Sequence, residues 1–323
     1  MRTSMRLRMT GAVLLALSAT VCVAQVEPVR ALRVVVPYPP GGSSDIQARL
    51  VAQGLGERLG QPVIVDNRPG ASAVIGTDYV ARQPADGTTL LLAAPPFVIT
   101  PYTEQKLPYD VKKDFVPVSL LSRAPMLVAV PRDSPAKAFG DLVSMARAQP
   151  GRLAYGSVGA GGLGHMATEL LAQQLKLDLV HVPYKGSAPA LTDLAGGRLA
   201  MMLTTQLDMA AQLSAGSVRV VAIGSPQRSR LLPEVPTVSE AGFGAVDLGN
   251  WFSGLSMRAG TRPEWTVRLS AEIAAVLQRP DVRERLDAQN VETVGSTPAQ
   301  YGAFLDAEHA RWAAVAAAIR APR

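Results

Sequence analysis

Cysteine is almost absent from this sequence, since Cys22 is the single one among 323 residues. It lies within residues 1–24, where three arginines, an apolar run and a small-residue ending at Ala24 are typical of a secretory signal peptide. We expect this segment to be removed, which leaves a mature chain without disulfides or thiol chemistry. A membrane anchor would need a longer apolar run. A lipoprotein would need Cys22 to be the modified residue, and the preceding Ala-Thr-Val matches that signal poorly.

Excess charge of one sign is also scarce. The net charge of +6 falls to +3 when the three arginines of the signal are removed. The remaining lysines and arginines are scattered, without a basic helix, zinc spacing or an aromatic run of the RNP type, so no nucleic acid is expected as a partner. No later hydrophobic stretch is long enough to cross a membrane. We therefore expect a soluble protein outside the cytoplasm. We also expect it to be a monomer.

Histidine is rare, and its three positions His165, His181 and His309 are far apart in the sequence. With no thiol to help them, they predict no metal site. His309 lies in AEHARW and is expected on the surface of a helix. No GxxxxGK[ST] motif is present, so a phosphate-binding loop of the Walker type is not expected either.

Glycine is plentiful, and GAGGLG at residues 159–164 matches G-x-G-x-x-G. A dinucleotide site would also need an acidic residue at the end of the next strand, to bind the ribose hydroxyls. That strand, LVHVPY, ends in Pro183-Tyr184-Lys185, and Asp178 lies before it. The motif therefore predicts no nucleotide, and we expect no cofactor.

Ser157 in YGSVG raises the alternative of a secreted serine hydrolase. A nucleophile elbow needs glycine two residues before the serine, where this chain has Tyr155. His165 follows at the start of the next helix, but the sequence places no acid to orient it. The hydrolase remains an open alternative, to be tested by ester turnover.

Strand-like and helix-like segments alternate along the chain, which predicts an α/β fold with mostly parallel sheets covered by helices on both faces. The predicted strands are 32–38, 62–67, 88–94, 126–130, 152–157, 178–184, 198–204, 218–225 and 251–257. The predicted helices are 43–60, 76–83, 138–149, 166–175, 187–197, 206–216, 263–279, 281–290 and a long one from about 297.

The chain is predicted to form two lobes with a ligand cleft between them. The segment after 225 has too few strands for a sheet of its own, so it is expected to return and complete the first lobe. The predicted lobes are 25–123 plus 226–323, and 124–225. Neither crossing is a long linker, so the lobes should move as a hinge.

Two loops at the ends of predicted strands carry the binding hypothesis, because open α/β sheets bind ligands there. In the first loop Pro39-Pro40 ends the strand and Gly41-Gly42 turns the chain. Ser43 or Ser44 can cap the next helix, whose first turn holds Asp45. Free N–H groups at such a start attract anions. Alternatively, Asp45 and the serines serve only their own helix.

The glycine loop after Ser157 repeats this arrangement in the second predicted lobe. Two helix starts that attract anions, one on each lobe, suit a ligand with carboxylates at both ends.

Several motifs together resemble one family, the Bug family of periplasmic solute receptors of tripartite tricarboxylate transporters. The resemblance rests on VVPYPPGGSSD, DNRPGASAVIGTDYVARQPADGTTLLL, YGSVGAGGLGH, VHVPYKGSAPALTDLAGG and LLPEVPTVSEAGF. It implies a two-lobed, type II periplasmic-binding-protein fold and a receptor rather than an enzyme. It also implies a small carboxylate ligand and delivery to a membrane permease with one large and one small subunit. A receptor that signals to a membrane sensor is the other alternative.

The resemblance also implies ligand-binding positions. In the first loop these are Tyr38, Pro39, Gly41, Gly42, Ser43 and Asp45. In the second loop they are Ser157, Gly159, Gly161, Gly162 and His165. In the middle of the cleft they are Ala94, Pro95, Tyr184, Lys185, Thr204 and Thr205. Lys185 could pair with a carboxylate or lie on a solvated rim, and Trp251 could pack at the cleft wall or in the core.

Three departures from the family's pattern affect these positions. Gly162 stands where a serine is common, near Gly164 where a hydroxyl residue is common, so the second loop offers more bare backbone. Pro95-Pro96 replaces a more polar loop. Thr204-Thr205 replaces a common Asp-Asn pair and removes a carboxylate, which disfavours a ligand with an ammonium group. The expected ligand is therefore a mono- or dicarboxylate or an aromatic acid.

Overall fold

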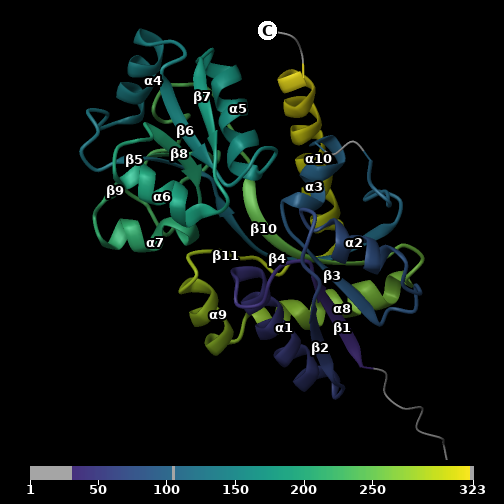
Figure 1. Ribbon diagram of the computed structural model, residues 1–323. Helices are drawn as coiled ribbons and strands as arrows, with labels where there is room; N and C mark the ends of the chain where they lie inside the picture. The colour runs from purple at the N-terminus through teal and green to yellow at the C-terminus, as the bar shows by residue number, and fades with distance from the viewer. Residues whose placement is uncertain (1–30, 104–105, 321–323) are drawn as a thin grey trace, which may run out of the picture.

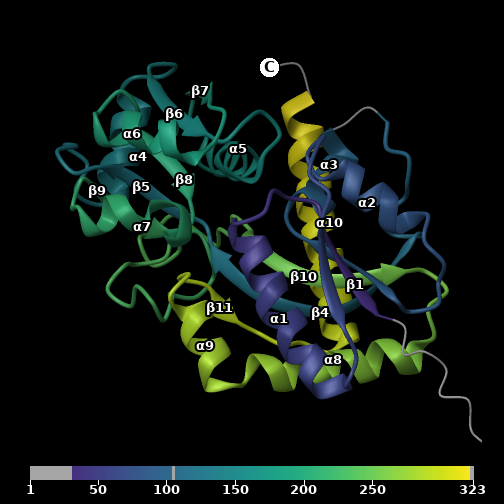
Figure 2. The same cartoon turned by 60° about the horizontal axis from the view of Figure 1, so that its bottom comes forward.

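Two β-sheets, each with helices on both faces, form two lobes in the computed structural model (Figures 1 and 2). The structure describes residues 31–103 and 106–320, so the expected signal peptide lies outside the described residues. The first sheet has the strand order β11-β4-β10-β3-β1-β2, and the second has the order β7-β6-β8-β5-β9. This arrangement confirms the α/β, two-lobed expectation.

Most strands and helices follow the predicted ranges closely, but no strand was predicted at residues 115–125 or 292–293 and no helix at residues 96–103. The strands are β1 Leu32–Val36, β2 Val63–Asn67, β3 Thr89–Ala93, β4 Phe115–Pro125, β5 Leu127–Pro131, β6 Leu153–Ser157, β7 Leu179–Pro183, β8 Met201–Thr204, β9 Val218–Ile223, β10 Asn250–Arg258 and β11 Glu292–Thr293. The helices are α1 Ser43–Leu59, α2 Val74–Ala81, α3 Pro96–Thr103, α4 Phe139–Ala148, α5 Leu163–Leu175, α6 Ser187–Ala195, α7 Gln206–Ser214, α8 Pro263–Leu277, α9 Pro280–Asp287 and α10 Pro298–Arg320.

Alternate residues of the strands enter different cores, because successive strand side chains point to opposite faces. In the first lobe, Val34 packs in a cluster with residues of α1 and α8, whereas Val35 packs in a cluster with residues of α2, α3 and α10. In the second lobe, Val128 packs with α4 and α5, whereas Ala129 packs with α6 and α7. Burial on both faces explains why these strands have nearly continuous apolar sequences.

The expectation of mostly parallel sheets is correct for only part of each sheet. β1 pairs in parallel with β2 and β3, and β6 with β7 and β8. β10 is antiparallel to β3 and β4, β11 to β4, and β5 to β8 and β9. The mixed pairing follows from the connections between lobes: β4 leads the chain out of the first lobe and β10 leads it back, so they run in opposite directions.

The lobe boundaries remain a proposal, and the structure offers contacts on which to base it. At the first crossing Met126 alone separates β4 from β5. After β9 the chain stays beside the second sheet, where Thr237 bridges to Ile223 and the Phe243 ring lies 5.1 Å from that of Phe139. We therefore propose that the second crossing lies near Gly249 rather than near residue 225.

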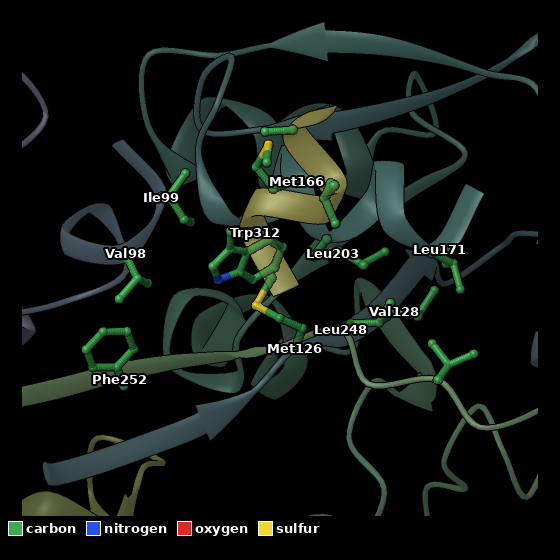
Figure 3. Packing of buried hydrophobic residues seen from close by; sticks show 14 of the residues in the cluster. Val98, Ile99, Met126, Val128, Met166, Leu171, Leu203, Leu248, Phe252 and Trp312 are labelled. Atoms are coloured by element: carbon green, nitrogen blue, oxygen red, sulfur yellow. The ribbon is translucent and has the colours of Figure 1, made fainter. Parts of the chain in front are cut away.

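Helix α10 packs against both lobes. Its Trp312 is fully buried and lies in one cluster with Ile99 of α3 and Met166 of α5, as Figure 3 shows. His309 of the same helix is 3% exposed, with Nδ1 3.3 Å from the Tyr102 hydroxyl, so the expected surface position is wrong. The alternation of polar and apolar residues in AEHARW did not reveal that this helix is covered on two sides. Among the helices of the described residues, none is long and apolar enough to span a membrane.

Candidate functional site

The first loop lies between β1 and α1, where the sequence placed it. Gly42 is the N-cap of α1 in an extended conformation, and no side chain caps this helix end. Ser43 and Ser44 therefore belong to the first turn, and the expected serine cap is wrong. The first intrahelical bond runs from the Ile46 N–H to the Gly42 carbonyl. The N–H groups of residues 43–45 precede that bond and are the orphan donors of the helix start.

Asp45 organises this loop from inside the protein. The side chain is 3% exposed, and it accepts hydrogen bonds from the Gly41 N–H, from Nε of Arg49 and from Nδ2 of Asn67, each at 2.9 Å. Burial alone would raise the pKa of the Asp45 carboxyl, but these bonds lower it below its usual value. Gly41 has φ +85°, a conformation that L side chains rarely adopt, so a glycine suits this corner.

The second loop lies between β6 and α5 and has the same backbone construction. Gly162 is the extended N-cap, and the first intrahelical bond runs from Met166 to the Gly162 carbonyl. Gly161, at φ +74°, donates its N–H over 3.0 Å to Nδ1 of His165, four residues along. The orphan donors are the N–H groups of residues 163–165.

The two loops therefore match residue by residue, from Gly41 to Asp45 and from Gly161 to His165. In each, the first glycine has positive φ, the second glycine begins the helix, and the fifth residue accepts from the first glycine. A carboxylate has that accepting role in the first lobe and an imidazole has it in the second. Among the described residues, the N–H groups at these two helix starts have no hydrogen-bond partner, and each start is the positive end of a helix dipole.

Ser157 and His181 support the second loop, through a hydrogen bond and through ring stacking. Ser157 is fully buried, donates to the Gly159 carbonyl at 3.0 Å and lies 2.7 Å from Nε2 of His181. The His181 ring stacks on that of His165 with centroids 4.0 Å apart. Burial, with a smaller contribution from His165, lowers the pKa of His181 to about 4, and burial also lowers the pKa of His165. Glu169 opposes both shifts.

Separation in the sequence therefore did not predict how close the histidines lie in the fold, since the rings of His165 and His181 are in contact. Within the described residues, no group of three or more histidine, cysteine or acidic side chains could hold a metal ion.

Thr204 and Thr205 lie beside the second loop, because a Cβ on Gly164 would come within 2.8 Å of the Leu203 carbonyl. Both threonines are buried, and their hydroxyls donate to the Asp208 carboxylate at 2.9 and 3.1 Å. An acid thus lies next to these threonines after all. This acid is exposed and already accepts from both hydroxyls, so the expectation that the ligand carries no ammonium group stays a prediction.

The remaining predicted positions differ in their burial and in their hydrogen bonds. The Tyr184 backbone N–H bonds the Ser157 carbonyl at 2.9 Å, but its hydroxyl donates to Asp193 over 2.8 Å. Lys185 is exposed. Ala94 and Pro95 are buried, and their carbonyls accept from the first turn of α3, a helix that the sequence reasoning missed. A proline at the first helical position, here Pro96, is the signal that could have revealed it.

Tyr38 and Trp251 lie where the lobes meet. Both pack, half-buried, against the core cluster of α1 and α8, and so does Leu207 of α7 in the other lobe. Across the same junction, a Cβ on Gly161 would lie 3.4 Å from Thr103 at the end of α3. The Tyr38 hydroxyl is buried and makes no hydrogen bond within the described residues, and burial raises its pKa.

Sequence reasoning missed three residues that shape the loops: Asn67, Arg49 and His181. Asn67 donates both to Asp45 and, over 3.1 Å, to the Tyr38 carbonyl. It ends β2, the parallel neighbour of β1, and that adjacency was the available signal. Direct contacts between any of these residues and a ligand remain predictions.

A cavity of about 700 Å³ lies apart from both loops, between α9 and the segment that follows β9. None of the predicted ligand residues lines it. Two of its arginines are already paired, Arg123 with Glu292 at 2.9 Å and Arg228 with Glu240 at 2.8 Å. The helix starts are therefore the better candidate for an anion site.

Comparison with known proteins places the chain in a family. The family model described as "Tripartite tricarboxylate transporter family receptor" matches residues 47–320. Protein BugT of Bordetella pertussis is 37% identical over 290 residues, which cover 89% of each chain. A protein encoded in the tcbD–tcbE intergenic region of Pseudomonas sp. (strain P51) is 38% identical over 286 residues, 88% of this chain and 85% of that protein.

Solved structures agree with this relationship. R. palustris Rpa4515 with adipate has a TM-score of 0.77 and 35% identity, covering 90% of this chain and 97% of that one. MatC from Rhodopseudomonas palustris with bound malate has a TM-score of 0.75 and 30% identity, covering 90% and 99%. The chain belongs to the tripartite tricarboxylate transporter receptor family.

Proposed function

We propose that the protein is a periplasmic receptor that closes its two lobes on a small carboxylate and delivers it to a tripartite membrane permease. The matched pair of glycine loops carries this proposal. Each loop leaves the N–H groups of a first helical turn unbonded, at residues 43–45 and 163–165. Bound between them, a carboxylate would accept several backbone hydrogen bonds in the favourable field of a helix dipole. Adipate and malate in two related structures support this ligand class.

The buried Tyr38 hydroxyl supports the same location. It is an orphan polar atom at the junction of the lobes, and such atoms usually find a partner in protein or water. We infer that it donates to the bound carboxylate, directly or through ordered water. Hinge closure would then bury the ligand, and the closed form would be the one the permease recognises.

The hydrolase alternative has one observation in its favour and two against it. The 2.7 Å contact between Ser157 and His181 resembles that of a nucleophile and its base. However, the Ser157 side chain is fully buried, and its hydroxyl donates to the Gly159 carbonyl. We therefore propose a receptor without enzymatic activity, and expect no ester turnover that Ser157→Ala abolishes.

The decisive experiment removes a single backbone N–H. Proline is tolerated at the first helical position, where Ser43 and Leu163 lie, and both follow an extended glycine that suits a pre-proline residue. Ser43→Pro and Leu163→Pro should each weaken binding at least about tenfold, since a charged acceptor loses a hydrogen bond of about 1.5–3 kcal/mol. Ser43→Ala and Leu163→Ala keep the N–H and serve as matched controls.

Adipate, malate and a panel of other small carboxylates are the probes, with sugars and cations as negative controls. Binding to the folded form should raise the melting temperature, and calorimetry then gives the dissociation constant. If only sugars or cations stabilised the protein, the carboxylate proposal would be wrong. If the proline and alanine variants bound equally well, the helix starts would not be the anion site.

A further inference from the structure

Three stacked rings lie behind the second loop, each from a different element. Tyr155 of β6 stacks on His181 of β7 with centroids 5.0 Å apart, and His181 stacks on His165 of α5 at 4.0 Å. The planes differ by 23° and 16°. The stack fixes the orientation of the His165 ring, and with it the direction of the Nδ1 lone pair toward the loop.

The bond from the Gly161 N–H to His165 dictates the protonation state of that ring. An imidazole nitrogen accepts a hydrogen bond only when it carries no proton, and both nitrogens of an imidazolium are donors. Because Nδ1 accepts over 3.0 Å, His165 is neutral with its proton on Nε2. In the stack below, the Ser157 hydroxyl uses its proton on the Gly159 carbonyl, so Nε2 of His181 is the donor in the 2.7 Å contact.

The surroundings contain little negative charge to offset a proton. Glu169 on α5 is the acidic group that acts on both imidazoles, and the Tyr155 hydroxyl already donates to it at 2.7 Å. Beside the loop glycines, α3 presents Thr103 and β8 presents the Leu203 carbonyl, and both are uncharged. Helix α10, which also packs against α5, contributes apolar Val315 and Ile319 to the hollow that Glu169 lines. If His165 and His181 were both protonated, two cationic rings would lie with their centroids 4.0 Å apart and would repel each other.

The first loop differs in this respect. Asp45 accepts from Gly41 as a carboxylate held by Arg49 and Asn67, and it stays ionised as the solution becomes mildly acidic. Resting on the proposed function, we propose that His165 is a positioning residue that makes the second anion loop pH-sensitive: a proton on Nδ1 breaks its bond with Gly161 and releases the loop, so carboxylate affinity falls on acidification. The first loop keeps its geometry under the same conditions.

A measurement on the ligand-free protein tests the positioning role directly. In ¹⁵N-histidine-labelled protein, His165 should show an unprotonated Nδ1 at neutral pH. The Gly161 amide resonance should then move with the His165 ring as both titrate, while the Gly41 amide stays in place. A proton on Nδ1 at neutral pH, or a Gly161 amide that ignores the titration of the ring, would overturn the proposal.

A conservative variant keeps an acceptor for the Gly161 N–H but removes the titratable imidazole. His165→Asn supplies an oxygen that accepts from Gly161 at any pH, as Asp45 does for Gly41, but it cannot become a cation in this range. With adipate and malate as probes, the wild-type dissociation constant should rise more than that of His165→Asn as the pH is lowered from about 7.5, and the difference should approach about tenfold per pH unit below the pKa of His165. Both proteins share the titration of the probe itself, so the difference isolates His165.

His165→Ala completes the set, since it removes the acceptor and should bind weakly at every pH. An equal pH dependence in wild type and His165→Asn would refute the inference. The NMR titration needs no ligand, so a protein that binds neither probe at neutral pH contradicts the proposed ligand class, and the Gly161 amide alone then decides whether His165 controls the loop.

Discussion

Acidification should destabilise the folded protein through His309, by an amount that the structure allows us to work out. The ring is 3% exposed between α10 and α3, and burial, with a contribution from Lys112, lowers its pKa to about 4. Asp306 and Asp110 oppose the shift. In the unfolded chain the pKa returns to about 6.5. Between these two pKa values the unfolded state binds a proton that the folded state does not. The free energy of unfolding therefore falls as the pH drops below about 6.5.

The size of the effect follows from linkage. Lowering the pH from about 7.5 to 5.5 should reduce the free energy of unfolding by about 1.3 kcal/mol through this one histidine. His181 and His165 shift in the same direction, but their partial exposure makes their contributions smaller. Carboxyl groups with lowered pKa values begin to titrate only below this window. Burial raises the pKa of Glu308, but this carboxyl is present in wild type and in a His309 variant, so a comparison of the two proteins isolates the histidine.

Urea unfolding at closely spaced pH values, for wild type and His309→Gln, measures the effect. Glutamine keeps a polar side chain of similar length but cannot take up a proton, so about 1.3 kcal/mol of the pH dependence should disappear in the variant. The absolute stability of the variant is irrelevant, because the comparison is between slopes. Identical slopes in the two proteins would refute the assignment of a buried neutral imidazole at this position.

Three further changes probe packing and the first loop. Gly254→Ala should cost about 2 kcal/mol or more, because the new Cβ would lie 2.3 Å from the buried Tyr301 ring; an unchanged urea midpoint would mean that the ring moves aside freely. Trp312→Phe removes the Nε1–H that bonds buried Glu308 at 2.9 Å and should cost about 1–3 kcal/mol; a smaller loss in calorimetry would mean that the carboxyl finds another donor. Asn67→Ala should reduce the free energy of adipate and malate binding by more than it reduces the free energy of unfolding. A larger loss of unfolding free energy than of binding free energy would assign Asn67 to stability alone.

Most of the architecture could be predicted from the sequence. Continuous apolar strands such as Leu32–Val36, alternating with helices at short intervals, have few solutions other than sheets buried on both faces. The glycines of both loops were equally readable, because positive φ at Gly41 and Gly161 is a local demand that glycine satisfies at little cost. Their position before a helix start also pointed to anion binding.

The side chains that hold those loops, and the groups that surround them, come from distant parts of the chain and could not be predicted locally. His181 reaches the second loop because β7 lies beside β6 in the sheet, a neighbour relation that no local pattern contains. His309 is buried because α10 packs against both lobes, and the acid near Thr204 comes from the next helix as Asp208. The antiparallel strands arise from the path of the chain between lobes. Local residue chemistry therefore specifies the helix starts, whereas long-range packing determines which side chains fix them and in which protonation state.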